Sequence, residues 1–502
     1  RGPQGTLFGR NTVGGAIQVF SARPQFSGIS GNAGAVVGDY DRMEVRGVVN
    51  VPISDTLAFR GAAITCDFRA HRIVRFTLSE NGAGFAAKHE GDFIRSSATS
   101  FRPIDVKQGP DGALYIADFY NRIIGHYEVR LDHPGRDRET GRIWRLVYNG
   151  PKGERLAKSV NLPAAPLDQA IAELASPLLA RRMTATDYLA DDVGQHAAAP
   201  LGQAMARAGA KPELKAHGAW VLHRLGQLDE ATQLRLANDK SELVRVHARR
   251  IAAAQKNWTP KTTAVVLAGL HDSSPQVRRA AADALARQSH ADHIRPLLTA
   301  LGQAPATDGH LRHALRIALR NNLRAVDDPA RFADLKNDPK NLRELMSVAL
   351  SVNSPFAASL LLVNLHDAGI ERGQLTIYLR HIARNAPPEG LNRLAALVQK
   401  QFPGNLDFQA ELLLAINDGI VQRGLTPEQG VLAWAEKLAG ELLAATEAVG
   451  THWVAEPAKG VPPSGIPWIV QTRSIPASTP KWKNHPHPDH PTASPWIPQV
   501  RA

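Results

Sequence analysis

Residues 270–281 read Leu-His-Asp-Ser-Ser-Pro-Gln-Val-Arg-Arg-Ala-Ala, a polar turn that runs into the start of a helix. The same helix opening recurs along the chain at intervals of roughly thirty residues. The related copies are Leu214–Gly218, Val244–Ala248 and Leu311–Ala314. A helix opening repeated at this interval is typical of an α-solenoid, in which each repeat buries its apolar face against the next.

The helical pattern extends well beyond these copies. From about Leu167 to about Val449 the chain is rich in Ala, Leu, Arg and Gln and has a 3.6-residue periodicity. The repeats resemble HEAT repeats, an armadillo-like helical architecture whose exposed ridge contacts protein partners. We therefore predict a mainly α fold with N-terminal β segments, the HEAT-like α-solenoid covering residues 165–450. The solenoid core is predicted at Val277, Ala281, Ala284 and Leu285.

Two N-terminal regions have the pattern of β-structure. Residues 1–64 alternate apolar and polar side chains, as in Ala16–Phe20 and Met43–Val51. Residues 66–148 contain short strand-like runs separated by Gly, Pro and Asp turns such as Gly109–Gly112. The runs are Arg72–Leu78, Ile104–Lys107, Ala113–Ala117 and Arg142–Val147.

Composition excludes several classes of protein. The 502 residues contain no apolar run near the roughly 18–20 residues of a membrane-spanning helix, so we expect no transmembrane helix. The one cysteine, Cys66, cannot form an internal disulfide or a CxxC metal site. The net charge of +12 comes from Lys and Arg interleaved with Asp and Glu, so no nucleic acid partner is expected. Residues 457–502 hold eleven of the 34 prolines and predict a Pro-rich irregular tail.

The first residues carry a dense motif. Residues 1–24 read Arg-Gly-Pro-Gln-Gly-Thr-Leu-Phe-Gly-Arg-Asn-Thr-Val-Gly-Gly-Ala-Ile-Gln-Val-Phe-Ser-Ala-Arg-Pro. This segment resembles the end of the plug domain of TonB-dependent outer-membrane receptors, and residues 34–63 continue the resemblance into the first barrel strands of that family. The resemblance implies an outer-membrane location and nutrient or siderophore transport. A receptor needs about twenty strands, so two or three strands cannot transport alone.

Residues 66–148 resemble another family, the putative membrane-bound dehydrogenases. The resemblance is carried by Gly-Pro-Asp-Gly-Ala-Leu-Tyr-Ile-Ala-Asp-Phe-Tyr-Asn at 109–121 and Gly-Arg-Ile-Trp-Arg at 141–145, and it covers most of residues 66–470. The β-propeller of that family is similar to that of pyrroloquinoline-quinone (PQQ) sugar dehydrogenases, and the matched stretch closes the propeller before HEAT-like helices. It implies PQQ and Ca²⁺ as cofactors, a c-type cytochrome partner, and a periplasmic or extracytoplasmic, membrane-associated location.

Four polar residues follow one of the predicted strands on a single loop. They are Asp118, Asn121, Arg122 and His126. In a propeller such a loop faces the central channel. The resemblance suggests that His126 takes a proton from a sugar hydroxyl and that Asp118, Asn121 and Arg122 bind the cofactor, with Asp118 suited to Ca²⁺. In the alternative interpretation these side chains only bond backbone groups of the loop.

Other histidines have simpler interpretations. His217 and His247 occupy equivalent positions in the repeats and are predicted to be hydrogen-bonded solenoid residues. His485-Pro-His-Pro-Asp-His490 offers Zn²⁺ ligands, but its prolines prevent helical presentation, so no metal site is assigned.

The sequence favours a composite chain. We expect a fragment of a quinoprotein-like membrane-bound dehydrogenase, with a HEAT scaffold for protein interaction, that is inactive alone and binds no cofactor because most of the propeller is missing. The alternative is a fragment of a TonB-dependent receptor. The abrupt change at residues 65–66 suggests a joined or misassembled reading frame.

Overall fold

The computed structural model describes residues 19–20, 30–38, 42–50, 61–123, 129–130, 132–147 and 159–449. The chain divides into two compact units, Arg1–Ala435 and Glu436–Ala502, and the sheets belong to the first. The described part is mainly helical and its strands all precede the helices. This confirms the predicted fold class of a mainly α protein with N-terminal β segments.

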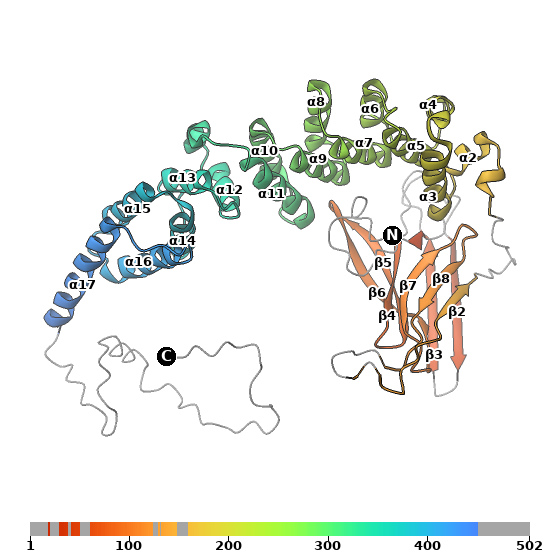
Figure 1. Ribbon diagram of the computed structural model, residues 1–502, viewed down its shortest axis with the longest axis horizontal. Coiled ribbons are helices and arrows are strands. Elements are labelled where there is room, and N and C mark those ends of the chain that lie inside the picture. Colours follow the sequence, from red (N-terminus) through yellow and green to blue (C-terminus); the bar gives the residue numbers. More distant parts are fainter. Residues whose placement is uncertain are drawn as a thin grey trace. The chain divides into compact units, whose positions relative to one another are not determined.

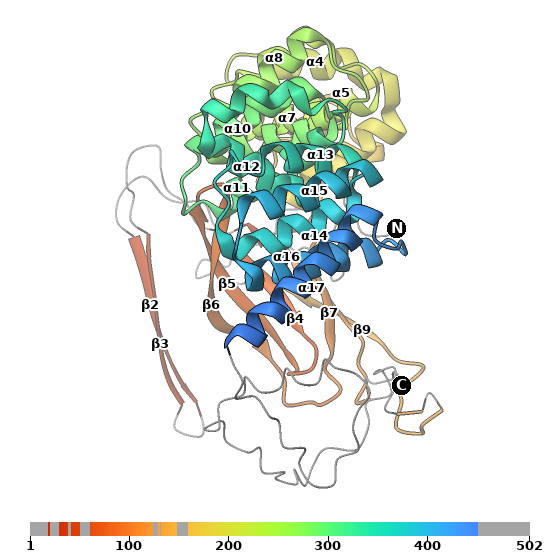
Figure 2. The same ribbon diagram turned by 90° about the vertical axis from the view of Figure 1, so that its left-hand side faces the viewer.

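The strands of the described residues form antiparallel sheets. One sheet has the order β1-β4-β5-β6 and another the order β7-β8-β9, while β2 and β3 form a hairpin of their own (Figure 2). The bounds are β1 Val19–Phe20, β2 Ser30–Gly38, β3 Arg42–Asn50, β4 Gly61–Asp67, β5 Arg72–Asn81, β6 Gly84–Arg95, β7 Pro103–Gln108, β8 Leu114–Asp118 and β9 Arg142–Leu146. The four strand-like runs predicted between residues 66 and 148 therefore correspond to β5, β7, β8 and β9.

Apolar side chains of both larger sheets meet in one small core. Its buried members are Ile64, Ile73, Phe101, Val106 and Ile116. Because β4 runs without interruption through residues 65–66 and pairs with β5 along its whole length, the predicted join lies inside a strand. The second β segment therefore starts upstream of the predicted residue 66.

Helices fill the chain from residue 167 to residue 449, as the periodicity predicted. The α-helices are α2 Leu167–Glu173, α3 Leu179–Asp187, α4 Ala198–Ala206, α5 Pro212–Arg224, α6 Glu230–Ala237, α7 Glu242–Ala254, α8 Pro260–Ala268, α9 Pro275–Arg287, α10 Ile294–Gln303, α11 Gly309–Leu323, α12 Pro339–Ala349, α13 Pro355–Asn364, α14 Leu375–Asn385, α15 Pro388–Gln401, α16 Leu406–Val421 and α17 Gln429–Val449. Short 3₁₀ or π turns occur at Leu162–Ala164, Tyr188–Val193, Gly194–Ala197, Gly269–His271, Ala291–His293, Pro329–Asn337 and Arg372–Gln374.

The helices stack as an α-solenoid. Each repeat contributes a second helix that packs on the second helix of the next repeat, so that α5 contacts α7, α7 contacts α9 and α9 contacts α11 (Figure 1). The predicted core is confirmed, because Val277, Ala281, Ala284 and Leu285 are all 0% exposed. Burial of these stripes between neighbouring repeats is the main source of solenoid stability.

The turns before α9 and α11 explain why these two helices begin where they do. In α9 the Ser274 hydroxyl accepts the N–H of Val277 at 3.3 Å, and Pro275 occupies the first helical turn, where a missing N–H costs nothing. In α11 the carboxylate of Asp308 caps the N–H of Leu311 at 3.0 Å. No helix in the described ranges is both long and apolar enough to cross a bilayer.

Candidate functional site

The loop predicted to face a propeller channel packs around a buried arginine, Arg102, which directly precedes β7 and is 7% exposed. Its Nε donates to the carbonyl of Asn121 and its Nη2 to the carbonyl of Arg122, both at 3.0 Å. Its Nη1 donates to the carbonyl of Phe68 at 2.9 Å. Burial lowers the pKa of Arg102, and the surrounding carbonyl oxygens replace part of the lost water. The guanidinium therefore ties the turn after β4 to the loop after β8.

Asp118 ends β8 and is 3% exposed. Its Oδ1 accepts the backbone N–H of Arg102 at 2.7 Å and that of Tyr120 at 2.9 Å. Its Oδ2 accepts the indole N–H of Trp144, on β9, at 2.9 Å. A carboxylate that accepts N–H groups from three segments is a structural cross-link.

The other three predicted site residues, Asn121, Arg122 and His126, differ in how the structure places them. Asn121 is 3% exposed, and its amide donates to the Asp137 carbonyl at 2.7 Å while accepting the N–H of Ile123 at 3.1 Å. The side chain of Arg122 is exposed, and only its carbonyl joins the Arg102 cluster. His126 lies outside the described residues. The structure thus brings Asp118 and Asn121 together, around a residue that the sequence analysis missed because a lone Arg before a strand carries no spacing signal.

The described residues of this loop do not fit a Ca²⁺ site. Calcium takes six to eight oxygen ligands, whereas the Asp118 carboxylate is surrounded by N–H donors. Among the described residues no group of three or more His, Cys, Asp or Glu side chains is placed to hold a metal ion. The Gly109–Gly112 turn nearby is structural as well, with Gly112 at φ +86° donating its N–H to the Gly109 carbonyl at 2.9 Å.

Strand β9 leaves an open edge with exposed apolar side chains. It pairs with β8 on one side, and no other described strand pairs with it. Ile143 is 75% exposed and Trp144 is 43% exposed. The Arg142 guanidinium stacks 3.5 Å from the centre of the Tyr120 ring. A strand edge without a partner among the described strands, with large exposed apolar side chains beside it, is suited to pairing with another strand.

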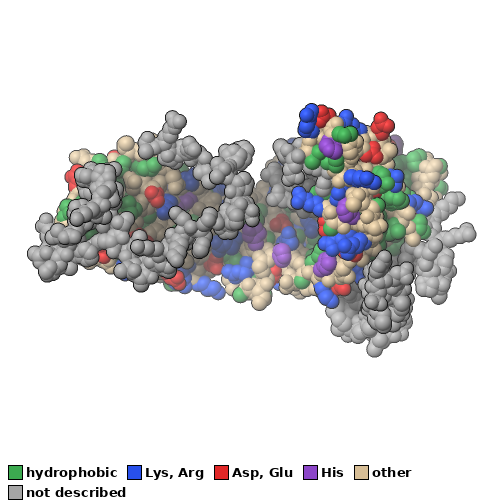
Figure 3. Space-filling model, turned by 90° about the horizontal axis from the view of Figure 1, so that it is seen from below, with side chains coloured by type: hydrophobic (Ala, Val, Ile, Leu, Met, Phe, Trp, Pro, Cys, Tyr) green, Lys and Arg blue, Asp and Glu red, His purple; other side chains and the backbone are tan. Residues whose placement is uncertain are grey.

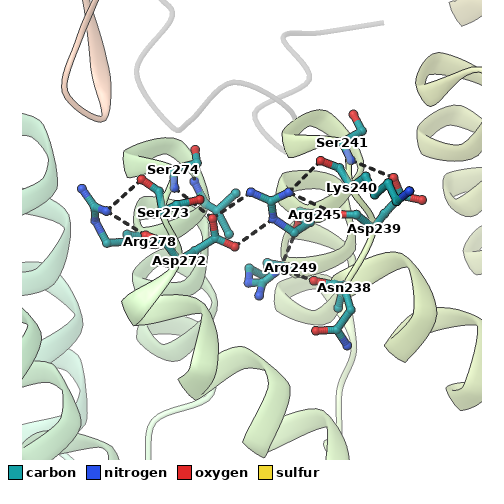
Figure 4. Close-up of polar contacts among 12 residues, drawn as sticks. Asn238, Asp239, Lys240, Ser241, Arg245, Arg249, Asp272, Ser273, Ser274 and Arg278 are labelled. Carbon is teal, nitrogen blue, oxygen red and sulfur yellow. Dashed lines mark hydrogen bonds and ion pairs between the residues drawn. The ribbon is translucent and has the colours of Figure 1, made fainter.

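Ion pairs link successive repeats of the solenoid in a ladder (Figure 4). Lys215 on α5 pairs with Asp239 in the next turn at 2.8 Å. Arg245 on α7 pairs with Asp272 in the following turn, Nε to Oδ2 at 2.8 Å and Nη2 to Oδ1 at 2.9 Å. Burial by itself raises the pKa of Asp272, but the hydrogen bonds from Arg245 and from the Ser274 N–H hold it below its ordinary value. Each acid therefore supports its own turn and the preceding repeat.

The two equivalent solenoid histidines are hydrogen-bonded, as predicted. The Nε2 of His217 accepts from the Arg182 guanidinium at 3.2 Å, and its Nδ1 lies 3.0 Å from the Thr186 hydroxyl. The Nδ1 of His247 accepts the indole N–H of Trp220 at 2.9 Å. Burial, helped by neighbouring cations, lowers the pKa of His217 to about 4 and that of His247 to about 3. Both imidazoles are therefore neutral at pH 7. The predicted histidine run at 485–490 lies outside the described residues.

The tip of the β5–β6 hairpin contacts the solenoid. The Ala83 N–H donates to Oδ2 of Asp308, the cap of α11, at 2.9 Å, and the Arg279 guanidinium on α9 donates to the Ala83 carbonyl at 3.2 Å. Ala83 is 0% exposed. The contact needs small residues, because a Cβ on Gly84 would lie 2.2 Å from the His310 ring. Two neighbouring repeats thus bind one β-turn.

Residues 56–150 match the model of a family described as a domain of unknown function (DUF7133). The matched range begins before the predicted join at residues 65–66 and includes β4 to β9. No curated protein matches the chain.

Proposed function

We propose that this chain is the protein-interaction scaffold of a quinoprotein-like, membrane-bound dehydrogenase that acts outside the cytoplasm. Its second β segment is the closing part of a larger propeller, and its solenoid binds a protein partner. Chemistry with PQQ and Ca²⁺ requires polar groups beyond those of this segment.

The observation that carries the proposal is how Asp118 and Asn121 are used. Both are 3% exposed and both direct their hydrogen bonds into their own sheet and loop. A planar cofactor needs several convergent polar groups that are free to bind it. Asp118, which links β8 to β9, and Asn121, which links two parts of the loop between them, do not have that freedom, so we assign both to the stability of the segment.

Two surfaces support an interaction role. Strand β9 offers an open edge whose Ile143 is 75% exposed, which suits pairing with a neighbouring blade. The solenoid surface is charged, and Figure 3 shows both basic and acidic side chains on the face that it draws. A helical surface that carries charges of both signs is suited to binding another protein rather than the phosphate backbone of a nucleic acid.

The proposal is tested first by activity. The purified chain is incubated with PQQ, Ca²⁺, a sugar or alcohol and an artificial electron acceptor, and we expect no turnover. Turnover that Asp118→Asn abolishes, while a melting curve shows the variant folded, would overturn the assignment of Asp118 to structure.

The scaffold role is tested by cross-linking. In cells that produce the chain, a lysine-reactive cross-linker followed by mass spectrometry should join a second polypeptide to the exposed solenoid lysines Lys240, Lys261 and Lys340. Lys88 and Lys107, exposed on the β segment, provide the comparison. Cross-links to a second polypeptide from these two alone, or from none of the five, would contradict a partner on the solenoid.

A further inference from the structure

The ion-pair ladder stops at one repeat. In the turns before α7 and α9 the ladder acid stands two residues before the N-cap, as Asp239 before Ser241 and Asp272 before Ser274. In the turn before α11 the N-cap is Asp308, and the residue two positions earlier is Ala306. The turn before α11 therefore lacks the acid that the turn before α9 offers to the preceding repeat in the form of Asp272.

Arg278 on α9 is the cation that this missing acid would pair with. Its Nη1 donates to the carbonyls of Asp272 and Ser273 at 2.7 and 3.2 Å, both in its own turn. No carboxylate among the described residues forms an ion pair with it, whereas Arg245, one repeat earlier, holds Asp272 through two nitrogens. Figure 4 shows Arg245 spanning the gap to the next turn, and Arg278 on the opposite side of that turn, where its guanidinium bonds the turn's own carbonyls.

A cavity of about 430 Å³ lies beside Arg278, between α9, α10 and α11. Apolar side chains line most of it, including Leu270, Leu311 and Leu315. The polar groups at its wall are Arg278, His271 and Gln303. None of its lining residues is acidic, so the cavity combines mainly apolar walls with a guanidinium whose Nε and Nη2 donate to no residue that the structure describes.

We propose that this cavity, the ladder-gap pocket, binds an acidic side chain of a partner protein, an Asp or Glu flanked by apolar residues. The carboxylate takes the place on Arg278 that the Asp272 carboxylate takes on Arg245. The apolar neighbour rests on Pro305, an exposed apolar side chain of the lining, while Leu270, Leu311 and Leu315 are buried behind it. Charge-assisted hydrogen bonds of this kind are short and specific, and a single guanidinium over an apolar floor suits one carboxylate better than a run of phosphates. The inference rests on the proposed scaffold role and names the chemistry of its partner.

The test uses the full chain and fluorescence polarisation. The probe is a fluorescein-labelled peptide, Gly-Gly-Leu-Asp-Leu-Gly-Gly with blocked ends, and its partner peptide has Asn in place of Asp. We expect the Asp peptide to bind at least about tenfold more tightly than the Asn peptide, the difference that a charge-assisted pair supplies. Arg278→Ala should abolish the difference. The matched control is Arg235→Ala, which removes one positive charge from an exposed site on α6 and should leave binding unchanged.

A second variant keeps the inference testable if Arg278→Ala unfolds. Ala306→Asp restores the acid within the chain, so it should occupy Arg278 and weaken the Asp peptide at least about tenfold without lowering the melting temperature. Equal binding of the two peptides, binding that survives Ala306→Asp, or displacement of the peptide by a single-stranded oligonucleotide would each overturn the inference. If solenoid lysines still cross-link to a second polypeptide, this failure leaves the scaffold role intact.

Discussion

Asp308 accepts the backbone N–H of Ala83 through Oδ2 at 2.9 Å, across 225 residues of sequence. Its other oxygen caps α11 by accepting the N–H of Leu311 at 3.0 Å. Asp308 is 4% exposed, and so one buried carboxylate both starts a solenoid helix and holds the tip of a β-hairpin. This double role makes the contact between the β segment and the solenoid measurable.

Asp308→Ala should destabilise the chain by about 2–4 kcal/mol, because it removes a helix cap and leaves the N–H of Ala83 buried without a partner. Ser274→Ala, which removes only the cap of α9, should cost about 1 kcal/mol. Urea unfolding followed by circular dichroism measures both losses. Equal losses would show that the hairpin contact contributes nothing.

Gly82→Ala should release the hairpin tip. Gly82 has φ +56°, and a Cβ there would lie 2.3 Å from the Asp308 carboxyl carbon. Gly91→Ala is the control, since Gly91 also has positive φ (+94°) but faces open space. Both variants pay about 1–2 kcal/mol of backbone strain, but only Gly82→Ala should speed hydrogen exchange at the amide of Ala83. Similar exchange in the two variants would contradict docking of the tip.

Lowering the pH should reduce the unfolding free energy of the solenoid already at pH values above those at which carboxylates titrate. The folded pKa values of His217 and His247, about 4 and about 3, lie below that of an unfolded histidine. The unfolded chain therefore binds protons first, so stability is full above about pH 6.5 and each imidazole removes about 1.4 kcal/mol per pH unit below it. Unfolding free energies measured from pH 7 to pH 4.5 should fall at least this steeply, because burial also lowers the pKa of His223, His293 and His381. His247→Gln, which removes one of these two buried imidazoles, should make the profile less steep.

Asp118→Asn should lower the unfolding free energy by about 1–3 kcal/mol. Oδ1 and Oδ2 together accept three N–H groups, and the variant replaces one of these two oxygens by an NH₂ group that cannot accept. Thermal melts of the variant and of the unchanged chain, measured by differential scanning calorimetry, give the loss. An unchanged melting temperature would argue for a functional rather than a structural carboxylate.

Periodicity predicted the solenoid well. The helical region begins at Leu167 and ends at Val449, and the core residues Val277 and Leu285 are fully buried. Helix packing depends on a short repeat that is visible in the sequence, so burial could be assigned from spacing alone. The strands β5, β7, β8 and β9 were predicted from short strand-like runs separated by Gly, Pro and Asp turns.

The polar contacts could not be predicted in the same way. Asp118 and Asn121 were identified as polar loop residues, but a cofactor ligand and a backbone cross-link look alike in sequence. The distinction depends on Arg102, which approaches them only because β7 and β8 pair. The bond between Ala83 and Asp308 joins residues too far apart for any pattern. The missing ladder acid at Ala306 is different, since aligning that turn with the turns at Asp239 and Asp272 would have revealed it.

The hairpin tip has a mechanical consequence. Ala83 bridges Arg279 on α9 and Asp308 at the start of α11, and these are the two helices between which the ladder ion pair is absent. The tip therefore connects α9 and α11, the two helices that no ladder ion pair connects. The ladder pairs are partly buried, with side-chain exposures of 16% and 11% for Arg245 and Asp272, so salt screens them in part, whereas the bond from the fully buried Ala83 N–H is screened still less. As ionic strength rises, the contact between α9 and α11 should therefore keep more of its strength than the contacts that depend on ladder ion pairs. The solenoid would then bend more easily on either side of the hairpin tip than at the tip itself.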